Sequence, residues 1–156
     1  MGETFVVPEV VVQKDTLLIP GTDGDKMSKS KNNTINIFLS DKELRKQIMS
    51  IETDSTPMEL PKNIDTCTIF ALFKLVASDL QITEMTVNYK KGNYGYGHAK
   101  QALFELIIEK YSKERELFNY YLNNRTVLDE KLQLGAIKAR SVAQPVLQRV
   151  RNILGY

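Results

Sequence analysis

The sequence predicts a mainly α-helical protein, in which a small bundle of about five helices follows a basic, turn-rich loop. From residue 40 onward, apolar residues recur at intervals of three and four, which is the spacing of one helix face. The chain has 156 residues, 42% of them apolar and 26% charged. These values describe one ordinary soluble domain that is long enough to bury a core.

Three short β-rich runs, at residues 5–7, 10–12 and 17–19, occupy the start of the chain. Prolines and charged residues separate them, and they are too few to close a sheet of their own. Unpaired strand edges invite aggregation, so we expect the neighbouring sheet to be supplied from outside this chain.

The first predicted helix begins at Ser40, which forms a capping box with Glu43. Its apolar stripe consists of Leu44, Ile48 and Ile51. Residues 53–63 contain two prolines and are predicted to be a loop.

The middle of the chain predicts three further helices. A nearly all-apolar helix opens at Asp65 or Thr66, reaches Val76 and is expected at the centre of the bundle. A short helix follows over about residues 83–89. A loop marked by Gly92, Gly95 and Gly97 leads to one long helix from residue 98 to about residue 122.

The last predicted helix begins near Thr126, with Asp129 in capping-box register, and ends at Gly155. Pro145 lies inside it and predicts a kink or a local break, because proline removes one helical hydrogen bond. The predicted apolar stripe consists of Leu128, Leu132, Ala136, Ala139, Val142, Ala143, Val146, Val150 and Ile153.

The loop at residues 21–34 carries the clearest chemical signal. Two glycines and two aspartates make its first part turn-prone, and Lys26 and Lys29 follow, each with a serine soon after. Ammonium and hydroxyl donors on such a loop can grip a polyphosphate while its charge shifts during a reaction. A solvated basic loop is the alternative that the residues alone leave open.

Other chemical sites fail on spacing or number. The P-loop register is broken because Lys26 lies five residues after Gly21, and a calcium loop starting at Asp23 lacks its ligands and glycine. The single cysteine, Cys67, excludes an internal disulfide and a cysteine-based zinc site. The single histidine, His98, is expected to be structural or a helix cap. We therefore predict no side-chain metal site, and no segment is long and apolar enough to span a membrane.

The C-terminal part of the chain is basic. Residues 136–156 contain Lys138, Arg140, Arg149 and Arg151 and no acidic residue. This stretch is a candidate footprint for RNA phosphates. Cations that complement the dipole of their own helix explain Arg149 and Arg151 equally well.

The segment Lys26-Met27-Ser28-Lys29-Ser30 is identical to the signature loop of class I aminoacyl-tRNA synthetases. Its extensions at residues 20–25 and 32–35 resemble the tryptophanyl-tRNA synthetase branch, as do residues 95–103 and 135–140. The resemblance covers essentially the whole chain and disfavours the related tyrosyl enzymes. Thr22, Lys31 and Thr126 depart from the usual pattern without removing a charged group.

The resemblance implies a two-step reaction in the intact enzyme. Tryptophan attacks the α-phosphate of ATP in the presence of Mg²⁺, and the acyl group then passes to tRNA(Trp). Lys29 and Lys26 are the implied catalytic residues, which meet charge on the β- and γ-phosphates. The implied ATP-binding set is Lys26, Met27, Ser28, Lys29 and Ser30.

The resemblance also implies a division of the chain. Residues 1–36 are expected to be the tail of a Rossmann-like catalytic domain, and residues 37–156 a helical anticodon-binding domain. The family's second signature, His-x-Gly-His, needs two histidines, so we expect the rest of the catalytic domain and the tryptophan pocket to be absent from this chain. The candidate tRNA-binding residues are Lys90, Lys91, Tyr94, Lys100, Lys138 and Arg140. Helix packing is the open alternative for Tyr94 and Lys100.

The intact enzyme is expected to be a cytoplasmic homodimer, and this chain alone is expected to be inactive. The alternative function is a free-standing, non-catalytic module that binds tRNA or another RNA, in which the lysine loop is vestigial. The intact loop and the orphan β-rich runs favour the first hypothesis, because an RNA-binding module needs neither.

Overall fold

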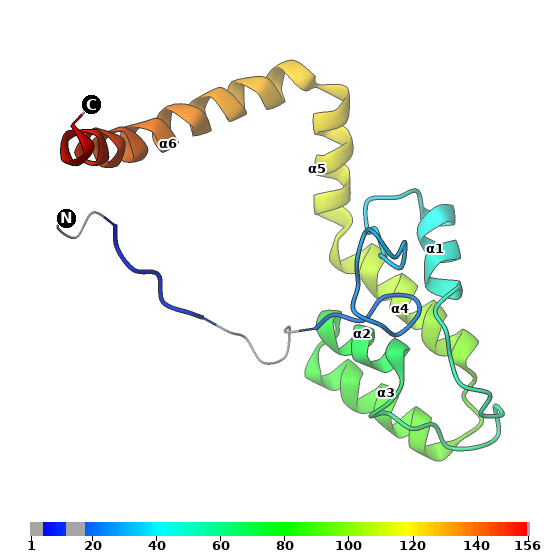
Figure 1. Ribbon diagram of the computed structural model, residues 1–156. Helices are drawn as coiled ribbons and strands as arrows, with labels where there is room; N and C mark the ends of the chain where they lie inside the picture. Colours follow the sequence, from blue (N-terminus) through cyan, green and yellow to red (C-terminus); the bar gives the residue numbers. More distant parts are fainter. Residues whose placement is uncertain (1–4, 12–17, 156) are drawn as a thin grey trace. The chain divides into compact units, whose positions relative to one another are not determined.

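The computed structural model describes residues 5–11 and 18–155, and every regular element among them is a helix. The helices are α1 (Asp41–Met49), α2 (Thr68–Val76), α3 (Asp79–Lys91), α4 (Tyr96–Lys110), α5 (Ser112–Asn123) and α6 (Arg125–Leu154) (Figure 1). The chain divides into a larger unit, Gln13–Glu116, and a smaller unit made of Met1–Val12 and Leu117–Tyr156. The division that the sequence predicts after residue 36 stays a prediction.

The β-rich runs form no strand within the described residues, and the expectation that a sheet outside this chain pairs with them stays a prediction. Residues 5–11 carry no regular structure, and Val6 is 92% exposed. A strand needs a hydrogen-bonded neighbour, and the described residues give residues 5–11 none. The predicted residues Val12 and Leu17 lie outside the described part of the chain.

Helix α1 begins as predicted. Ser40 accepts a hydrogen bond from the backbone of Glu43, and the Glu43 carboxylate accepts from the backbone of Ser40, which completes the capping box. The Ser40 hydroxyl also donates to the Glu43 carboxylate at 2.6 Å, and this bond, followed by the one from the Ser40 backbone, holds the pKa of Glu43 below its usual value. Arg115 secures the same helix end, because its guanidinium donates to the carbonyl of Ile37 and to Asp41.

Helices α2 and α3 differ from the predicted boundaries. Helix α2 starts two to three residues later than predicted, because the side chain of Asn63 accepts from the backbone N–H of Asp65 and forms a turn there. Helix α3 is longer than predicted, because Ser78 and Gln81 form a second capping box. Four residues of α2 are buried, but both α1 and α2 pack on α4, so the expectation that α2 is the central helix is wrong.

The glycine-marked loop and the helix after it also differ from prediction. Gly92 ends α3 in a left-handed conformation with φ of +76°, and Gly95 caps α4, but Gly97 lies inside α4. The predicted helix over 98–122 is two helices, α4 and α5, separated at Tyr111. Apolar spacing alone missed this break because it continues across Tyr111.

The core of the larger unit is built around α4, against which α1 and α2 pack. The apolar stripe of α4 that faces them is Ala99, Leu103 and Ile107, at intervals of four. The other buried apolar residues are Leu44, Ile48, Ile51, Cys67, Ile69, Phe70, Leu72, Phe73, Met85, Tyr89 and Leu106.

The segment between α1 and α2 is a loop over the predicted residues 53–63. It is held by Lys62, which is only 5% exposed and was not expected to be buried. Its ammonium donates to the carbonyls of Pro57 at 2.8 Å and Leu60 at 3.0 Å, and lies 5.2 Å from the ring centre of Tyr96. Tyr96 in turn donates to Asp54 at 2.8 Å.

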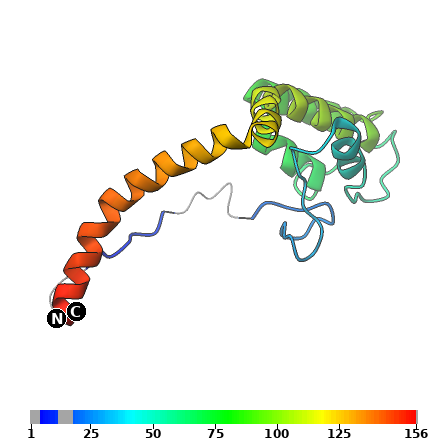
Figure 2. The same ribbon diagram turned by 90° about the horizontal axis from the view of Figure 1, so that it is seen from above.

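Helix α6 in the smaller unit ends at Gly155 as predicted, with φ of +82°. Its start differs, because Asn124 rather than Thr126 precedes the helix and no side chain caps it. The helix runs through Pro145 without a break, and Figure 2 shows its axis curving. No residue of α5 or α6 is buried, so the predicted apolar stripe of α6 is not part of the core. No helix in the described residues is long and apolar enough to cross a membrane.

The core assignment predicts the effect of a leucine truncation. Leu103→Ala removes a side chain that is 1% exposed and should lower the free energy of unfolding by about 2–5 kcal/mol through the cavity it leaves. The matched variant Leu132→Ala, at a position 60% exposed in α6, should change it by less than about 0.5 kcal/mol. Urea denaturation of both variants checks the pair, and equal losses would contradict the core assignment.

Candidate functional site

The lysine loop, residues 20–34, is closed by backbone hydrogen bonds within the larger unit. The N–H of Gly21 donates to the carbonyl of Asp25 at 2.7 Å, and the N–H of Thr22 donates to that of Asn33 at 2.9 Å. The N–H of Glu52 donates to the carbonyl of Thr22 at 2.7 Å. The loop is therefore tied both to itself and to the segment that follows α1.

The side chain of Asn33 is the centre of this loop and is 3% exposed. Its amide oxygen accepts from the N–H of Ser28 at 2.7 Å. Its amide nitrogen donates to the carboxylate of Asp23 at 2.7 Å and to the carbonyl of Lys26 at 3.2 Å. The bond from Asn33 is the main reason that the pKa of Asp23 lies below its usual value.

Lys26 and Lys29 are exposed, and within the described residues neither ammonium has an ion pair or hydrogen bond. Lys31 differs, because its ammonium pairs with Asp25 at 2.8 Å, which raises the pKa of Lys31. The two lysines expected to be catalytic are thus available to a ligand, and the third lysine of the loop closes it.

The other residues of the predicted ATP-binding set have two kinds of role. The hydroxyls of Ser28 and Ser30 lie 2.9 Å apart and can present donors together. The side chain of Met27 is partly buried and packs against the core. The structure therefore brings all five residues onto one loop and uses Met27 as its apolar anchor.

The candidate tRNA-binding residues are not gathered at one place. Lys90 and Lys91 are exposed at the C-terminal end of α3 in the larger unit, whereas Lys138 and Arg140 are exposed on α6 in the smaller unit. Each pair offers cations to solvent on a helix of its own unit.

Lys100 and Tyr94 take part in packing. The ammonium of Lys100 donates to the carbonyl of Met49 at 3.0 Å, and burial lowers its pKa. The ring of Tyr94 lies 5.9 Å from the ring centre of Tyr89 and 5.6 Å from that of His98, in the first turn of α4. The contact between Lys100 and α1 favours the packing alternative for that residue.

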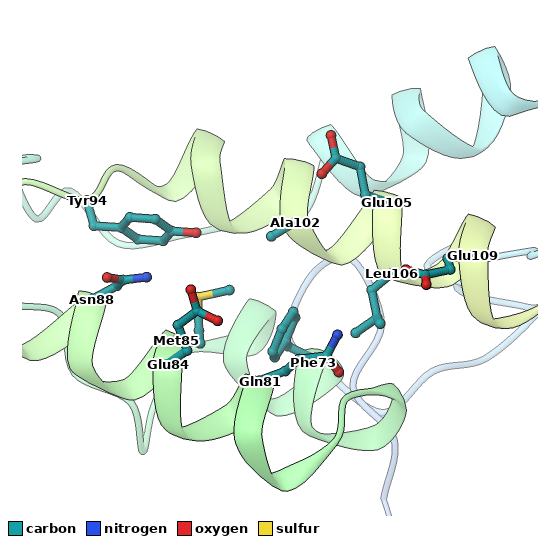
Figure 3. Close-up of a pocket in the computed structure, with 10 residues that line it drawn as sticks. All are labelled: Phe73, Gln81, Glu84, Met85, Asn88, Tyr94, Ala102, Glu105, Leu106 and Glu109. Atoms are coloured by element: carbon teal, nitrogen blue, oxygen red, sulfur yellow. The ribbon is translucent and has the colours of Figure 1, made fainter.

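Tyr94 also lines a groove between α3 and α4 that the sequence did not predict, with a volume of about 240 Å³ (Figure 3). Phe73, Met85 and Leu106 supply apolar surface. The polar lining residues are Gln81, Glu84, Asn88, Glu105 and Glu109. Burial, and then the charges of Glu84 and Glu105, raise the pKa of the Tyr94 phenol.

The groove has a periodic signal in the sequence. Its α3 residues at 81, 84, 85 and 88 and its α4 residues at 102, 105, 106 and 109 repeat the same helical spacing. Two helices that each carry a polar strip with that spacing can face one another across a groove. The sequence shows the spacing within each helix, but it does not show that α3 and α4 lie side by side.

Metal ligation by side chains finds no support in the described part of the chain. No group of three or more His, Cys, Asp or Glu residues there is close enough to hold an ion.

The loop geometry predicts the effect of a methyl group at Gly21. A Cβ there would lie 2.4 Å from Cγ of Asn33, so Gly21→Ala should displace the Asn33 side chain and speed tryptic cleavage after the loop lysines. Gly97→Ala meets nothing within 4 Å and should stabilise α4 by about 0.5–1 kcal/mol, with unchanged cleavage in the loop. Peptide mapping over time distinguishes the variants, and equal loop cleavage would contradict the packing of Gly21 on Asn33.

Comparison with known proteins places this loop in a family. The family described as tRNA synthetases class I (W and Y) matches residues 1–112. The tryptophan–tRNA ligase of Campylobacter jejuni is 44% identical over 99% of this chain and 48% of its own length. The corresponding enzyme of Fusobacterium nucleatum is 43% identical over 98% of this chain and 47% of its own length.

A solved structure gives the same result. Tryptophanyl-tRNA synthetase from Campylobacter jejuni, complexed with ADP and tryptophan, superposes with a TM-score of 0.86 at 44% identity. The match covers 99% of this chain and 49% of that chain. This chain thus spans about half the length of the curated relatives it matches, and it belongs to the family of class I tRNA synthetases for tryptophan and tyrosine.

Proposed function

We propose that this chain supplies the phosphate-binding loop and the tRNA-binding helical part of a tryptophan–tRNA ligase. The observation that supports this proposal most directly is a pair of exposed lysines on a hydrogen-bonded loop, whose ammoniums have no partner among the residues that the structure describes. The ADP and tryptophan bound to the Campylobacter jejuni relative support a nucleotide as the ligand.

In the proposed reaction, Lys29 and Lys26 stabilise the negative charge that accumulates on the β- and γ-phosphates of ATP. An ammonium on a flexible stem can follow that charge, while the fixed backbone of the loop limits where the stem starts. The hydroxyls of Ser28 and Ser30 add donors. Displacement at phosphorus needs mainly positioning and charge stabilisation, which these groups supply. Mg²⁺ is proposed to arrive with ATP as part of the substrate.

The helical part is proposed to bind the anticodon region of tRNA(Trp). Lys90 and Lys91 would attract phosphates, and the groove beside them offers the ring of Tyr94 for stacking on an unpaired base. Its carboxylates Glu84 and Glu105 can accept hydrogen bonds from the amino group of cytosine. This chemistry fits the tryptophan anticodon CCA, which contains two cytosines.

The alternative function is a free-standing RNA-binding module without catalysis. The groove and the exposed cations are compatible with it, but it gives no reason for an ordered loop with two exposed lysines. We further propose that the complete ligase is a cytoplasmic homodimer and that the chain by itself forms no adenylate.

The loop proposal is tested in a complete ligase, made by joining this chain to the part of the Campylobacter jejuni relative that it does not match. Lys29→Ala and Lys26→Ala should each slow tryptophan-dependent ATP–pyrophosphate exchange by about a hundredfold or more, because each removes a donor to developing charge. Lys42→Ala, an exposed lysine of α1, is the matched control and should leave the rate unchanged. Unchanged exchange in both loop variants would refute the proposal.

The tRNA proposal is tested by fluorescence binding of this chain to tRNA carrying the anticodon CCA and to the same tRNA with one cytosine changed. A preference of about tenfold, or roughly 1.4 kcal/mol, is expected. Glu105→Gln should reduce that preference, whereas Lys90→Ala should weaken binding to both tRNAs equally. Binding that shows no preference and disappears with salt would indicate phosphate attraction alone.

A further inference from the structure

Asn33 is an uncharged, buried side chain within a loop of charged and exposed residues. Its amide connects three positions, namely the backbone N–H of Ser28, the carbonyl of Lys26 and the carboxylate of Asp23. It therefore fixes the backbone on both sides of Met27, which is the backbone that carries Lys26 and leads to Lys29. No other side chain in the described loop bonds to more than two other loop residues.

The chemistry of the position selects asparagine. The site needs an acceptor for Ser28 and a donor for Asp23 and Lys26 on one short side chain, which only an amide provides. Gly21 leaves the space that this amide fills, because a Cβ at Gly21 would lie 2.4 Å from Cγ of Asn33. The other charges around it are accounted for, since Asp25 pairs with Lys31 and the ammonium of Lys26 stays exposed.

We infer that Asn33 is a positioning residue, which orders the loop backbone so that Lys26 and Lys29 meet the same polyphosphate while both ammoniums stay free. This inference rests on the proposed function of the loop. Asn33 itself touches no ligand in this scheme. It acts by holding the loop in the binding geometry before the ligand arrives, which removes the cost of ordering it on binding.

The inference makes a pH-dependent prediction for Asn33→Asp. The new carboxylate would face the carboxylate of Asp23 at the present amide distance of 2.7 Å and could not donate to Lys26. Two carboxylates this close raise the pKa of one of them, so a proton would return at acidic pH and restore a donor. Asp23 in the unsubstituted chain has a lowered pKa and stays ionised between pH 5 and 7.5, which are the values of the test.

The test measures binding of inorganic pyrophosphate to the 156-residue chain at pH 7.5 and pH 5.0, by isothermal titration calorimetry. Asn32→Asp is the matched control, because Asn32 is exposed, adjacent and changed by the same charge. At pH 7.5, Asn33→Asp should bind at least about tenfold more weakly than Asn32→Asp, and at pH 5.0 this difference should shrink to about threefold. Pyrophosphate itself changes protonation between the two pH values, but the ratio of the two variants' dissociation constants at one pH is unaffected by this change.

Gly21→Ala provides a second route to the same change. It should weaken pyrophosphate binding to a similar extent at both pH values, because displacement of the amide by a methyl group does not titrate. Equal binding by Asn33→Asp and Asn32→Asp at both pH values overturns the inference, provided that Lys29→Ala weakens binding. If Lys29→Ala binds as tightly as the unsubstituted chain, or if that chain shows no saturable binding, the proposed function fails and the positioning role fails with it.

Discussion

Burial of one face of α4 is the constraint on which the larger unit depends. Ala99, Leu103 and Ile107 lie along that face and are almost fully buried, and α1 and α2 pack on the same helix. Burying side chains of this kind contributes about 1.5–3 kcal/mol each for the larger ones. The lysine loop is attached to this core through the partly buried side chain of Met27 and is thereby given a fixed base.

In the lysine loop, the residues that stabilise the backbone are different from the residues whose side chains are exposed. Asn33, Gly21 and Asp23 form its interior, whereas the ammoniums of Lys26 and Lys29 make no hydrogen bond or ion pair within the described residues. Charged side chains that play no structural part can move without disturbing the backbone that supports them. This division explains how a short loop can be ordered at its backbone and adaptable at its side chains.

Local signals were the part of the fold that sequence could predict. The capping box of Ser40 and Glu43 lies within four residues, and Gly155 ends α6 because glycine adopts a positive φ easily. The sequence therefore predicted both helix ends. The break at Tyr111 was not predicted, because the apolar spacing continues across it. The β-rich runs form no strand in the described residues, because a strand needs a hydrogen-bonded neighbour, and the sequence of the runs does not show where that neighbour lies.

The candidate site was predictable to the same extent. The five signature residues 26–30 stand out in sequence, but the role of Asn33 depends on bonds to residues up to ten positions away. The groove beside Tyr94 depends on two helices meeting, and the spacing within each helix does not show which other helix it faces. Residues whose role lies in long-range contacts are therefore the ones that sequence reasoning missed.

The buried ammonium of Lys62 has a consequence for how the larger unit opens. It donates to the carbonyls of Pro57 and Leu60, and the backbone N–H of Lys62 donates to the carbonyl of Tyr89 at 2.8 Å. The segment 52–66 has little apolar burial of its own, but that backbone bond ties it to the end of α3, and Tyr96 of α4 contacts both Lys62 and Asp54. If the two segments open as one cooperative unit, amide hydrogen exchange in this loop should follow the same opening as the end of α3.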